Sequence, residues 1–207
     1  YFDIKKSKLT KINNPVDFEF IENKVKEGKK PAEYDPNYKN VVAIGNLSAR
    51  KGFDNLLKVF HHLKDQNIKL HILGDGRDKE LLHGIKYDLD LKNVIFHGRQ
   101  ANPYQFLSNA DLFILSSRYE GFPNVLLEAG ACGTYALAND CPGGINEIIE
   151  DQINGEIFAI EDHQGFANKI VSVLDKIHDT NAITESIRAR FSKEIILKQY
   201  EKILSKI

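Results

Sequence analysis

The chain has 207 residues, 42% of them hydrophobic, and a formal net charge of −1 at pH 7. This length allows one well-buried α/β domain, and the near-neutral charge argues against a nucleic-acid-binding protein, which usually carries a basic surplus. No apolar run approaches the roughly 18 residues of a membrane-spanning helix, and two cysteines without ligand spacing fit a reducing cytoplasm better than a disulfide framework.

The chain begins with a polar segment rich in lysine. Lys5, Lys6, Lys8 and Lys11 lie close together, a pattern typical of a solvated surface. Residue 1 is Tyr and no Met occurs in the sequence, so we expect a piece of a longer protein.

Apolar runs alternate with helical periodicity through the rest of the chain. Strands are predicted at 41–45, 69–73, 94–97, 111–116, 134–138 and 155–159. Helices are predicted at 18–25, 53–64, 78–87, 103–109, 124–132, 163–177 and 182–204, with a turn and short helix at 143–150. This alternation predicts an α/β fold with a Rossmann-like, doubly wound parallel sheet of about six strands.

The stretch RYEGFPNVLLE, residues 118–128, directly follows the fourth predicted strand. Gly121 permits a tight backbone, and Pro123 suits the first position of a helix, where its missing N–H costs nothing. A helix from Asn124 would present free N–H groups and a positive dipole end at the carboxyl edge of the sheet. We therefore expect an anion to bind there.

Two carboxylates flank this expected anion site. Glu128 lies only about 7 Å along the helix axis from Pro123, at ~1.5 Å per residue, and Glu120 lies in the preceding loop. Carboxylates are strong acceptors for hydroxyl groups, so the pair fits sugar recognition beside an anion. The alternative is a surface Glu and a helix Glu without a joint role.

The run SRYEGFPNVLLEAGACGT, residues 117–134, closely resembles the E-x7-E signature of retaining family-4 glycosyltransferases, which have the two-domain GT-B fold. The resemblance extends from about Asn14 to the C-terminus. Residues 14–17, NPVD, resemble the linker between the two domains of that family. The resemblance implies that residues 1–14 are the tail of a missing N-terminal domain with its linker. Residues 15–207 would be the nucleotide-sugar-binding domain with its C-terminal helices.

The resemblance also implies roles within the stretch. Glu128 would bind the ribose hydroxyls of the donor, and Glu120 the hydroxyls of the transferred sugar. The loop residues whose backbone would hold the sugar and the β-phosphate are Gly121, Phe122, Pro123 and Asn124.

A second predicted site lies just before the helix at 53–64. Arg50 and Lys51 directly precede this helix, so their two positive charges and the helix N-terminus face one point. This arrangement suits a diphosphate; the alternative is a solvated basic pair. Lys51 matches the phosphate-binding Lys of the family, whereas Asn46 stands where the family has Arg. We expect Arg50 to replace that Arg. Lys51, Arg50 and Glu120 form the predicted catalytic set, in which the cations stabilise the departing diphosphate.

The base of the donor is expected near the ends of the second and third strands. Gly74 lies in the turn that the family places near the nucleotide, and this turn lacks the third glycine of a dinucleotide fingerprint. Arg99 and Gln100 are candidates for contacts with the base, or else solvated loop residues. The glycines of residues 141–147 fit a turn around a ligand, although ordinary turn chemistry also explains them.

Asp88 and Asp90 resemble the D-x-D metal motif of the other large glycosyltransferase fold. In this chain they fall at a helix end, away from the carboxyl edge of the sheet. We therefore assign them no role and predict no metal and no cofactor, with the nucleotide sugar as substrate.

The predicted function is that of a glycosyltransferase fragment. It would bind a UDP-hexose or UDP-N-acetylhexosamine for retaining transfer to a glycan or lipid-linked acceptor in bacterial surface polysaccharide synthesis. Front-face attack is favoured over a covalent Glu120 intermediate. The acceptor would bind through the missing N-terminal domain, so this chain alone should transfer little.

We expect no nucleic-acid partner and a cytoplasmic location. Peripheral association with the inner face of the plasma membrane is an expectation for the full-length protein. Two alternatives remain: a GT-B-type nucleotide-sugar epimerase or hydrolase, and a non-catalytic binding module that keeps the fold.

Overall fold

The computed structural model describes residues 9–205. Lys5, Lys6 and Lys8 of the predicted basic segment lie outside these residues. The end of the predicted tail contacts the domain: Lys11 pairs with Glu147, and the Asn14 amide donates to Asn124 Oδ1 at 2.7 Å. The domain boundary at residue 14 stays a prediction.

Six parallel strands form one sheet in the order β3-β2-β1-β4-β5-β6. The strands are β1 (Lys39–Ile44), β2 (Ile68–Leu73), β3 (Val94–Gly98), β4 (Leu112–Leu115), β5 (Ala136–Asn139) and β6 (Gly155–Phe158). The order runs one way from β1 to β3 and the other way from β4 to β6, which is the doubly wound Rossmann arrangement. The predicted fold class is confirmed, and the direction of winding reverses between β1 and β4.

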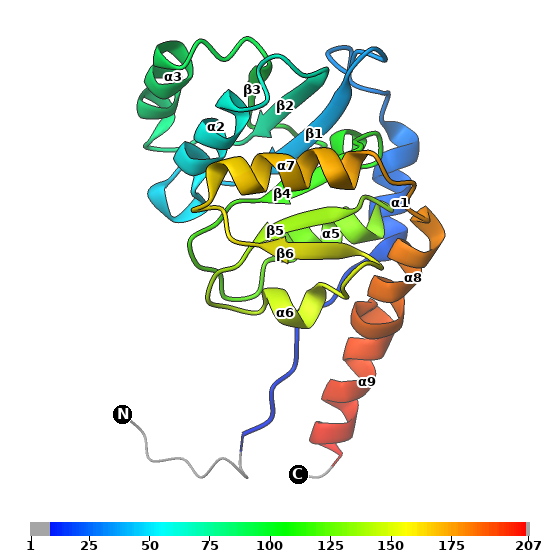
Figure 1. The fold of residues 1–207 in the computed structure, drawn as a ribbon. Coiled ribbons are helices and arrows are strands. Elements are labelled where there is room, and N and C mark those ends of the chain that lie inside the picture. The colour runs from blue at the N-terminus through cyan, green and yellow to red at the C-terminus, as the bar shows by residue number, and fades with distance from the viewer. Residues whose placement is uncertain (1–8, 206–207) are drawn as a thin grey trace.

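Helices cover both faces of this sheet (Figure 1). They are α1 (Phe18–Glu27), α2 (Phe53–His61), α3 (Lys79–Asp88), α4 (Tyr104–Leu107), α5 (Asn124–Ala131), α6 (Ile145–Ile148), α7 (His163–Leu174), α8 (Thr180–Phe191) and α9 (Lys193–Leu204). Successive strand residues point to opposite faces. Val41 and Ala43 therefore join the core with α2 and α7, whereas Val42 joins the core with α1, α4 and α5.

The predicted C-terminal helix at 182–204 is wrong in one respect, because it is two helices. Ser192 separates α8 from α9 with an extended backbone, φ −61° and ψ 151°. Val16 pairs with this residue: its N–H donates to Phe191 O at 2.8 Å, and its carbonyl accepts from Lys193 N at 3.0 Å. The break thus combines a bridge to a distant segment with a local cap, since Ser192 Oγ accepts from Ile195 N at the start of α9. Figure 1 shows α9 extending away from the sheet.

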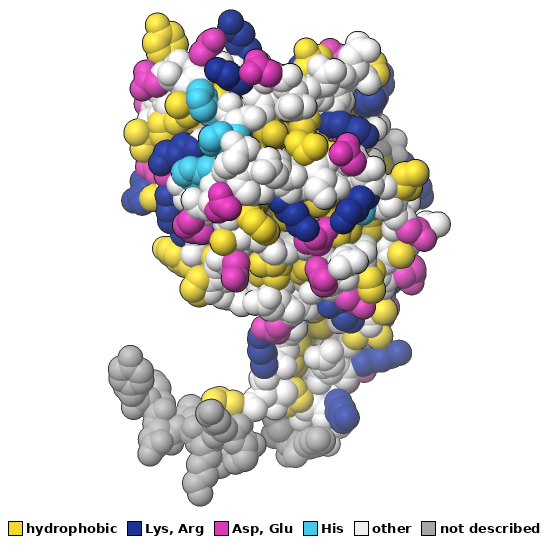
Figure 2. All heavy atoms as spheres, viewed as in Figure 1, with side chains coloured by type: hydrophobic (Ala, Val, Ile, Leu, Met, Phe, Trp, Pro, Cys, Tyr) yellow, Lys and Arg dark blue, Asp and Glu magenta, His cyan; other side chains and the backbone are white. Residues whose placement is uncertain are grey.

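Surface charges of both signs are mixed over the face seen in Figure 2, which agrees with the net charge of −1. In residues 9–205, no helix combines the length and the apolar character needed to cross a membrane.

Candidate donor site at the switch point of the sheet

The loops after β1 and β4 lie against each other where the winding of the sheet reverses. The loop after β1 contains a short 3₁₀ turn, η2 (Ala49–Lys51), where the sequence pattern predicts a plain loop. Gly52 follows this turn with φ +65°, and a Cβ there would lie 2.1 Å from Ser116 O. Glycine is therefore required at this position both by the left-handed backbone and by the close approach of Ser116, which directly follows β4. This packing brings the predicted phosphate-binding turn next to the RYEGFPN loop.

Three of the predicted residues meet in one ionic cluster. Lys51 Nζ lies 2.5 Å from Glu120 Oε1, and Arg50 Nη1 lies 2.9 Å from Glu120 Oε2. The Ser117 hydroxyl also donates to Glu120 Oε1, at 2.6 Å. The Glu120 side chain is 6% exposed and the Lys51 side chain 12%, whereas Arg50 is 38% exposed. The cluster thus has a buried interior and one accessible cation.

The protonation of Glu120 follows from these contacts. Burial by itself would raise the pKa of Glu120, but hydrogen bonds from Lys51 and Ser117, together with the charges of Lys51 and Arg50, hold this pKa below its ordinary value. Glu120 is therefore ionised at neutral pH. The two cations and one carboxylate leave a net positive charge at the mouth of the site, most of it accessible at Arg50, and this charge favours an anion.

Helix α5 begins beside this cluster. Pro123 is the residue before the helix, with φ −77° and ψ 96°, so the expected place at the first helical position is wrong by one residue. Among residues 9–205, no side chain caps this helix end. The first backbone N–H groups of α5 are therefore available to a ligand, as its position at the carboxyl edge of the sheet predicts.

The glycine that shapes the donor loop is Gly143, and the expectation of a tight backbone at Gly121 is not met. Gly121 has no positive φ, and a Cβ added there would meet no atom of the described residues 9–205 within 4 Å. Gly143, in contrast, has φ +139°, and a Cβ there would lie 2.0 Å from Glu120 O. The loop at 141–147 therefore folds closely around the protein backbone at Glu120, while Gly121 borders open space. Phe122 packs edge-on against Phe191, with ring centroids 5.8 Å apart.

Glu128 lies in a different environment from Glu120. It faces a cavity of 140 Å³ that Val16, Phe20 and Tyr104 also line. Burial raises the pKa of Glu128, and no charge or hydrogen bond from residues 9–205 offsets this effect. Burial, followed by the charge of Glu128, raises the pKa of Tyr104 to about 12. A half-buried carboxylate without a partner is suited to accept hydrogen bonds from hydroxyl groups.

The three residues predicted near the base share one hollow with Asn46, which was predicted on the phosphate side. This hollow of 360 Å³ lies at the carboxyl ends of β1, β2 and β3, and its lining includes Asn46, Gly74, Arg99 and Gln100. Gln100 Nε2 donates to His97 O at 2.7 Å, which orients its amide. Gly74 has φ +143°, and a Cβ there would lie 1.9 Å from Gly45 O. The turn at Gly74 is therefore glycine because β1 approaches it closely.

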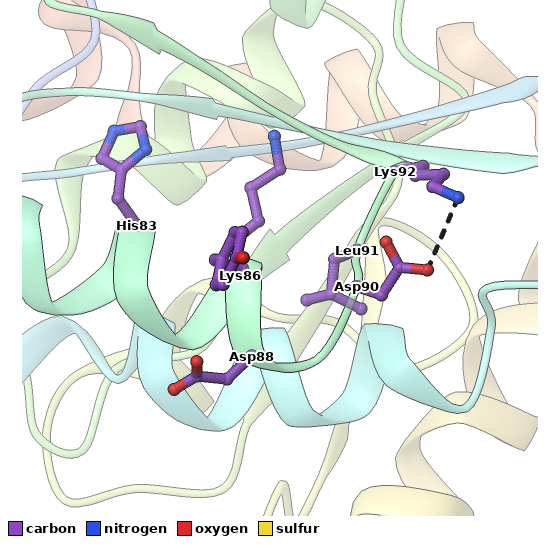
Figure 3. A pocket seen from close by; sticks show the side chains of 7 residues that line it. His83, Lys86, Asp88, Asp90, Leu91 and Lys92 are labelled. Atoms are coloured by element: carbon purple, nitrogen blue, oxygen red, sulfur yellow. Dashed lines mark ion pairs between the residues drawn. The ribbon is translucent and has the colours of Figure 1, made fainter.

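Asp88 and Asp90 lie at the opposite edge of the sheet, because α3 starts after β2 and runs back to the beginning of β3. They line a hollow of 750 Å³ with His83 and Lys92, in which the two carboxylates point in different directions (Figure 3). Asp90 pairs with Lys92 at 3.5 Å. Within residues 9–205, no group of three or more His, Cys, Asp or Glu residues is arranged to hold a metal.

Sequence reasoning missed three residues that shape the site. Ser117 donates to Glu120, and Tyr104 borders the cavity of Glu128. Buried Asn139, at the end of β5, donates from Nδ2 to Ser117 O at 2.9 Å and accepts from Ile160 N at 2.9 Å. The available signal was a polar residue directly after a buried strand, as at Ser116–Ser117 and at Asn139.

Comparisons with known proteins agree with this geometry. The sequence model of the family described as glycosyl transferases group 1 matches residues 24–190. The lipopolysaccharide core biosynthesis glycosyltransferase LpsE of Rhizobium meliloti is 31% identical over 173 residues, which cover 80% of this chain and 49% of LpsE. The lipopolysaccharide 1,6-galactosyltransferase of Salmonella typhimurium is 36% identical over 112 residues, 50% of this chain and 31% of that protein. The chain thus spans at most about half the length of these relatives.

Solved structures show the same fold. The apo form of WaaB, a lipopolysaccharide outer core galactosyltransferase, is similar with a TM-score of 0.80 at 25% identity, over 99% of this chain and 58% of that chain. HepE of Anabaena, solved in complex with UDP, is similar with a TM-score of 0.83 at 23% identity, over 98% of this chain and 59% of that chain. With its six-stranded Rossmann-like sheet and a family match over residues 24–190, the chain belongs to the glycosyl transferases of group 1, which have the GT-B fold.

Proposed function

We propose that this chain is the donor-binding domain of a retaining family-4 glycosyltransferase, and that it binds a UDP-hexose or UDP-N-acetylhexosamine. The observation that carries the proposal is the convergence of Lys51, Arg50 and Glu120 beside the uncapped N-terminus of α5. Cations, free backbone N–H groups and a helix dipole at one point are the elements that bind a diphosphate. Glu128 then binds the ribose hydroxyls, and the hollow at Asn46, Gly74, Arg99 and Gln100 receives the base.

The charges of this site support a reaction in which the diphosphate departs with its electrons. Lys51, Arg50 and the α5 dipole are in place before the reaction, so they stabilise the developing negative charge without reorganisation. The Glu120 carboxylate lies beside the leaving group, where it receives the hydroxyls of the transferred sugar.

The contacts of Glu120 favour front-face attack over a covalent intermediate. Its two oxygens already accept hydrogen bonds from Lys51, Arg50 and Ser117, which makes the carboxylate a weak nucleophile. Its lowered pKa also makes it a weak base at neutral pH. The donor phosphate is therefore the group that takes the proton of the acceptor hydroxyl.

The acceptor is a glycan or lipid-linked sugar in the synthesis of a bacterial surface polysaccharide. The names of relatives such as LpsE support this class of product. In the full-length protein the acceptor binds through the N-terminal domain. This chain alone binds the donor and transfers little.

The test is thermal unfolding of this chain with UDP-, GDP-, ADP- and CDP-linked sugars. A ligand at 100 times its Kd stabilises by about 2.7 kcal/mol, so one nucleotide should raise the melting temperature clearly. The Glu128→Ala variant should lose this shift, whereas Asp88→Asn, at the opposite edge of the sheet, should keep it. The proposal is wrong if none of these nucleotides stabilises either this chain or the full-length protein.

A non-catalytic binding module is the second candidate, and one observation favours it. Asn46 stands where the family has a phosphate-binding Arg. Its side chain packs against Gly76, because a Cβ added to Gly76 would lie 2.1 Å from Asn46 Oδ1. Transfer of radiolabelled sugar by the full-length protein separates the two candidates. Nucleotide binding without transfer or hydrolysis would support the module.

A further inference from the structure

A second ionic contact, between Arg118 and Asp54, adjoins the cluster of Lys51, Arg50 and Glu120. Arg118 Nη1 donates to Asp54 Oδ1 at 2.8 Å, and Arg118 Nη2 donates to Asp54 Oδ2 at 2.6 Å. Such a bidentate pair fixes the orientation of the guanidinium plane. Asp54 belongs to the first turn of α2, where the helix dipole favours a carboxylate. Arg118 is therefore anchored to a helix that belongs to the rigid core.

The same residue binds the backbone of the turn η2. Arg118 Nη1 donates to Ala49 O at 2.5 Å, and the Arg118 backbone N–H donates to Arg50 O at 2.8 Å. The next carbonyl, Lys51 O, accepts from the Ser116 hydroxyl at 2.8 Å. All three carbonyls of η2 thus accept hydrogen bonds from the segment 116–118. The turn itself has two backbone hydrogen bonds, from Lys51 N–H to Ser48 O at 2.9 Å and from Gly52 N–H to Ala49 O at 3.3 Å. Such a short 3₁₀ turn leaves its other polar groups to be satisfied from outside, and the segment 116–118 does so.

These contacts have a direct consequence for the cations. The side chains of Arg50 and Lys51 extend from η2 to Glu120, which follows Arg118 by two residues. We propose that Arg118, anchored by Asp54, is a positioning residue that fixes η2 on the donor loop and so places Lys51 and Arg50 for the diphosphate. This assignment rests on the proposed function, since it gives Arg118 its role through the donor site. Lysine cannot replace it, because an ammonium group lacks the planar fork that binds Asp54 and Ala49 O together.

A nuclear magnetic resonance titration tests the positioning without any nucleotide. The Glu120 carboxyl is labelled with carbon-13, and its pKa is measured in the wild type and in Arg118→Gln. We expect the pKa of Glu120 to rise toward its ordinary value in the variant, because Lys51 is no longer held against it. The matched control is Arg188→Gln: Arg188 is 39% exposed against 37% for Arg118, and it pairs with Glu22 and Glu185 instead of residues of the Glu120 cluster. Arg188→Gln should leave the pKa of Glu120 unchanged.

Nucleotide binding then measures the effect on the site. Isothermal titration of this chain with UDP, GDP, ADP and CDP identifies the nucleotide, and the corresponding monophosphate serves as the comparison. Arg118→Gln should weaken diphosphate binding about tenfold, because small misplacements of binding groups are costly, and monophosphate binding less than about twofold. In a double-mutant cycle with Lys51→Ala, most of the tenfold loss should disappear, because Arg118 acts through Lys51.

Several results would overturn the assignment. Arg118 is only structural if Arg118→Gln lowers the melting temperature but changes neither the pKa of Glu120 nor the diphosphate affinity. Additive losses in the cycle would give the same conclusion. If Arg118→Gln does not fold, Asp54→Asn removes the anchor with a smaller change and takes its place. Failure of the wild type to bind any of the four diphosphates would count against the proposed function, while the Glu120 titration would still decide the positioning.

Discussion

The two glutamates of the E-x7-E stretch occupy opposite environments within one small region. Glu120 is held by Lys51, Arg50 and Ser117, so its pKa is lowered in spite of its burial. Glu128 is half-buried, and within residues 9–205 no charge or hydrogen bond offsets its desolvation, so its pKa is raised. The first carboxylate is part of a completed ionic cluster and contributes to stability. The Glu128 carboxylate pays a desolvation cost that no contact within residues 9–205 offsets. Such a cost is typical of a group that binds a ligand.

The largest expected effect is the loss of the Glu120 cluster. Lys51→Met should lower the free energy of unfolding by about 2 kcal/mol, because it leaves a buried carboxylate with one cation fewer. Urea denaturation at pH 7 measures this change. The double variant Lys51→Met/Glu120→Gln should recover part of the loss, since it removes the unpaired charge. Equal losses in the single and double variants would contradict the account of Glu120 as a charge paired with Lys51.

Glu128→Gln should act in the opposite direction. It removes a charge that burial disfavours, so the free energy of unfolding should rise by roughly 1 kcal/mol at pH 7. The same variant should lose nucleotide binding, so the substitution would increase stability and abolish function. A destabilised Glu128→Gln protein would mean that the carboxylate has a partner that supports the fold.

The pH dependence of stability should separate the two residues by sign. The pKa of Glu120 is lowered on folding, so its stabilisation is present above the ordinary value of 4.5 and is lost as pH falls through the folded-state pKa. The pKa of Glu128 is raised, so its folded state is favoured below 4.5, and this advantage is lost as pH rises through the folded-state pKa.

Urea denaturation at pH 7, pH 4 and pH 3 measures both contributions. Between pH 7 and pH 3 the wild type should lose more stability than Glu120→Gln, because the stabilisation by Glu120 is lost only below about pH 4.5. The gain from Glu128→Gln should be present at pH 7 and absent at pH 4. Parallel pH profiles for the two variants would contradict the difference between the two sites.

The smallest expected effect lies at the opposite edge of the sheet. Asp90 and Lys92 form a pair at 3.5 Å whose side chains are 77% and 87% exposed. Water already solvates both charges, so Lys92→Ala should leave the unfolding curve unchanged within experimental error. A clear loss of stability in Lys92→Ala would show that this exposed ion pair contributes more to the free energy of unfolding than solvation of its charges predicts.

Much of the fold could be read from local patterns. The apolar runs of β1, β2 and β4 and the helical periods between them report which residues face the core, and this information is contained in a few neighbouring positions. Alternating strands and helices then leave a parallel, doubly wound sheet as the solution that buries both sheet faces. The sequence alone therefore placed Glu120, Lys51 and the start of α5 at the carboxyl edge of one sheet.

Other features depend on segments far apart in the chain. Val16 pairs with Ser192 at the break between α8 and α9, where Ser192 also caps α9 locally. Gly143 rather than Gly121 must be glycine, because Glu120 packs against it. Arg118 has partners 64 and 69 residues away in Asp54 and Ala49.

The periodicity of a sequence indicates which residues are buried and which backbone conformation they adopt. It does not indicate which loops contact each other in the folded protein. Whether a charged side chain is paired, strained or free was therefore decided only by the tertiary structure. That packing pairs Glu120 with Lys51 and Arg50 and gives Glu128 no such partner within residues 9–205, although both residues belong to the same motif.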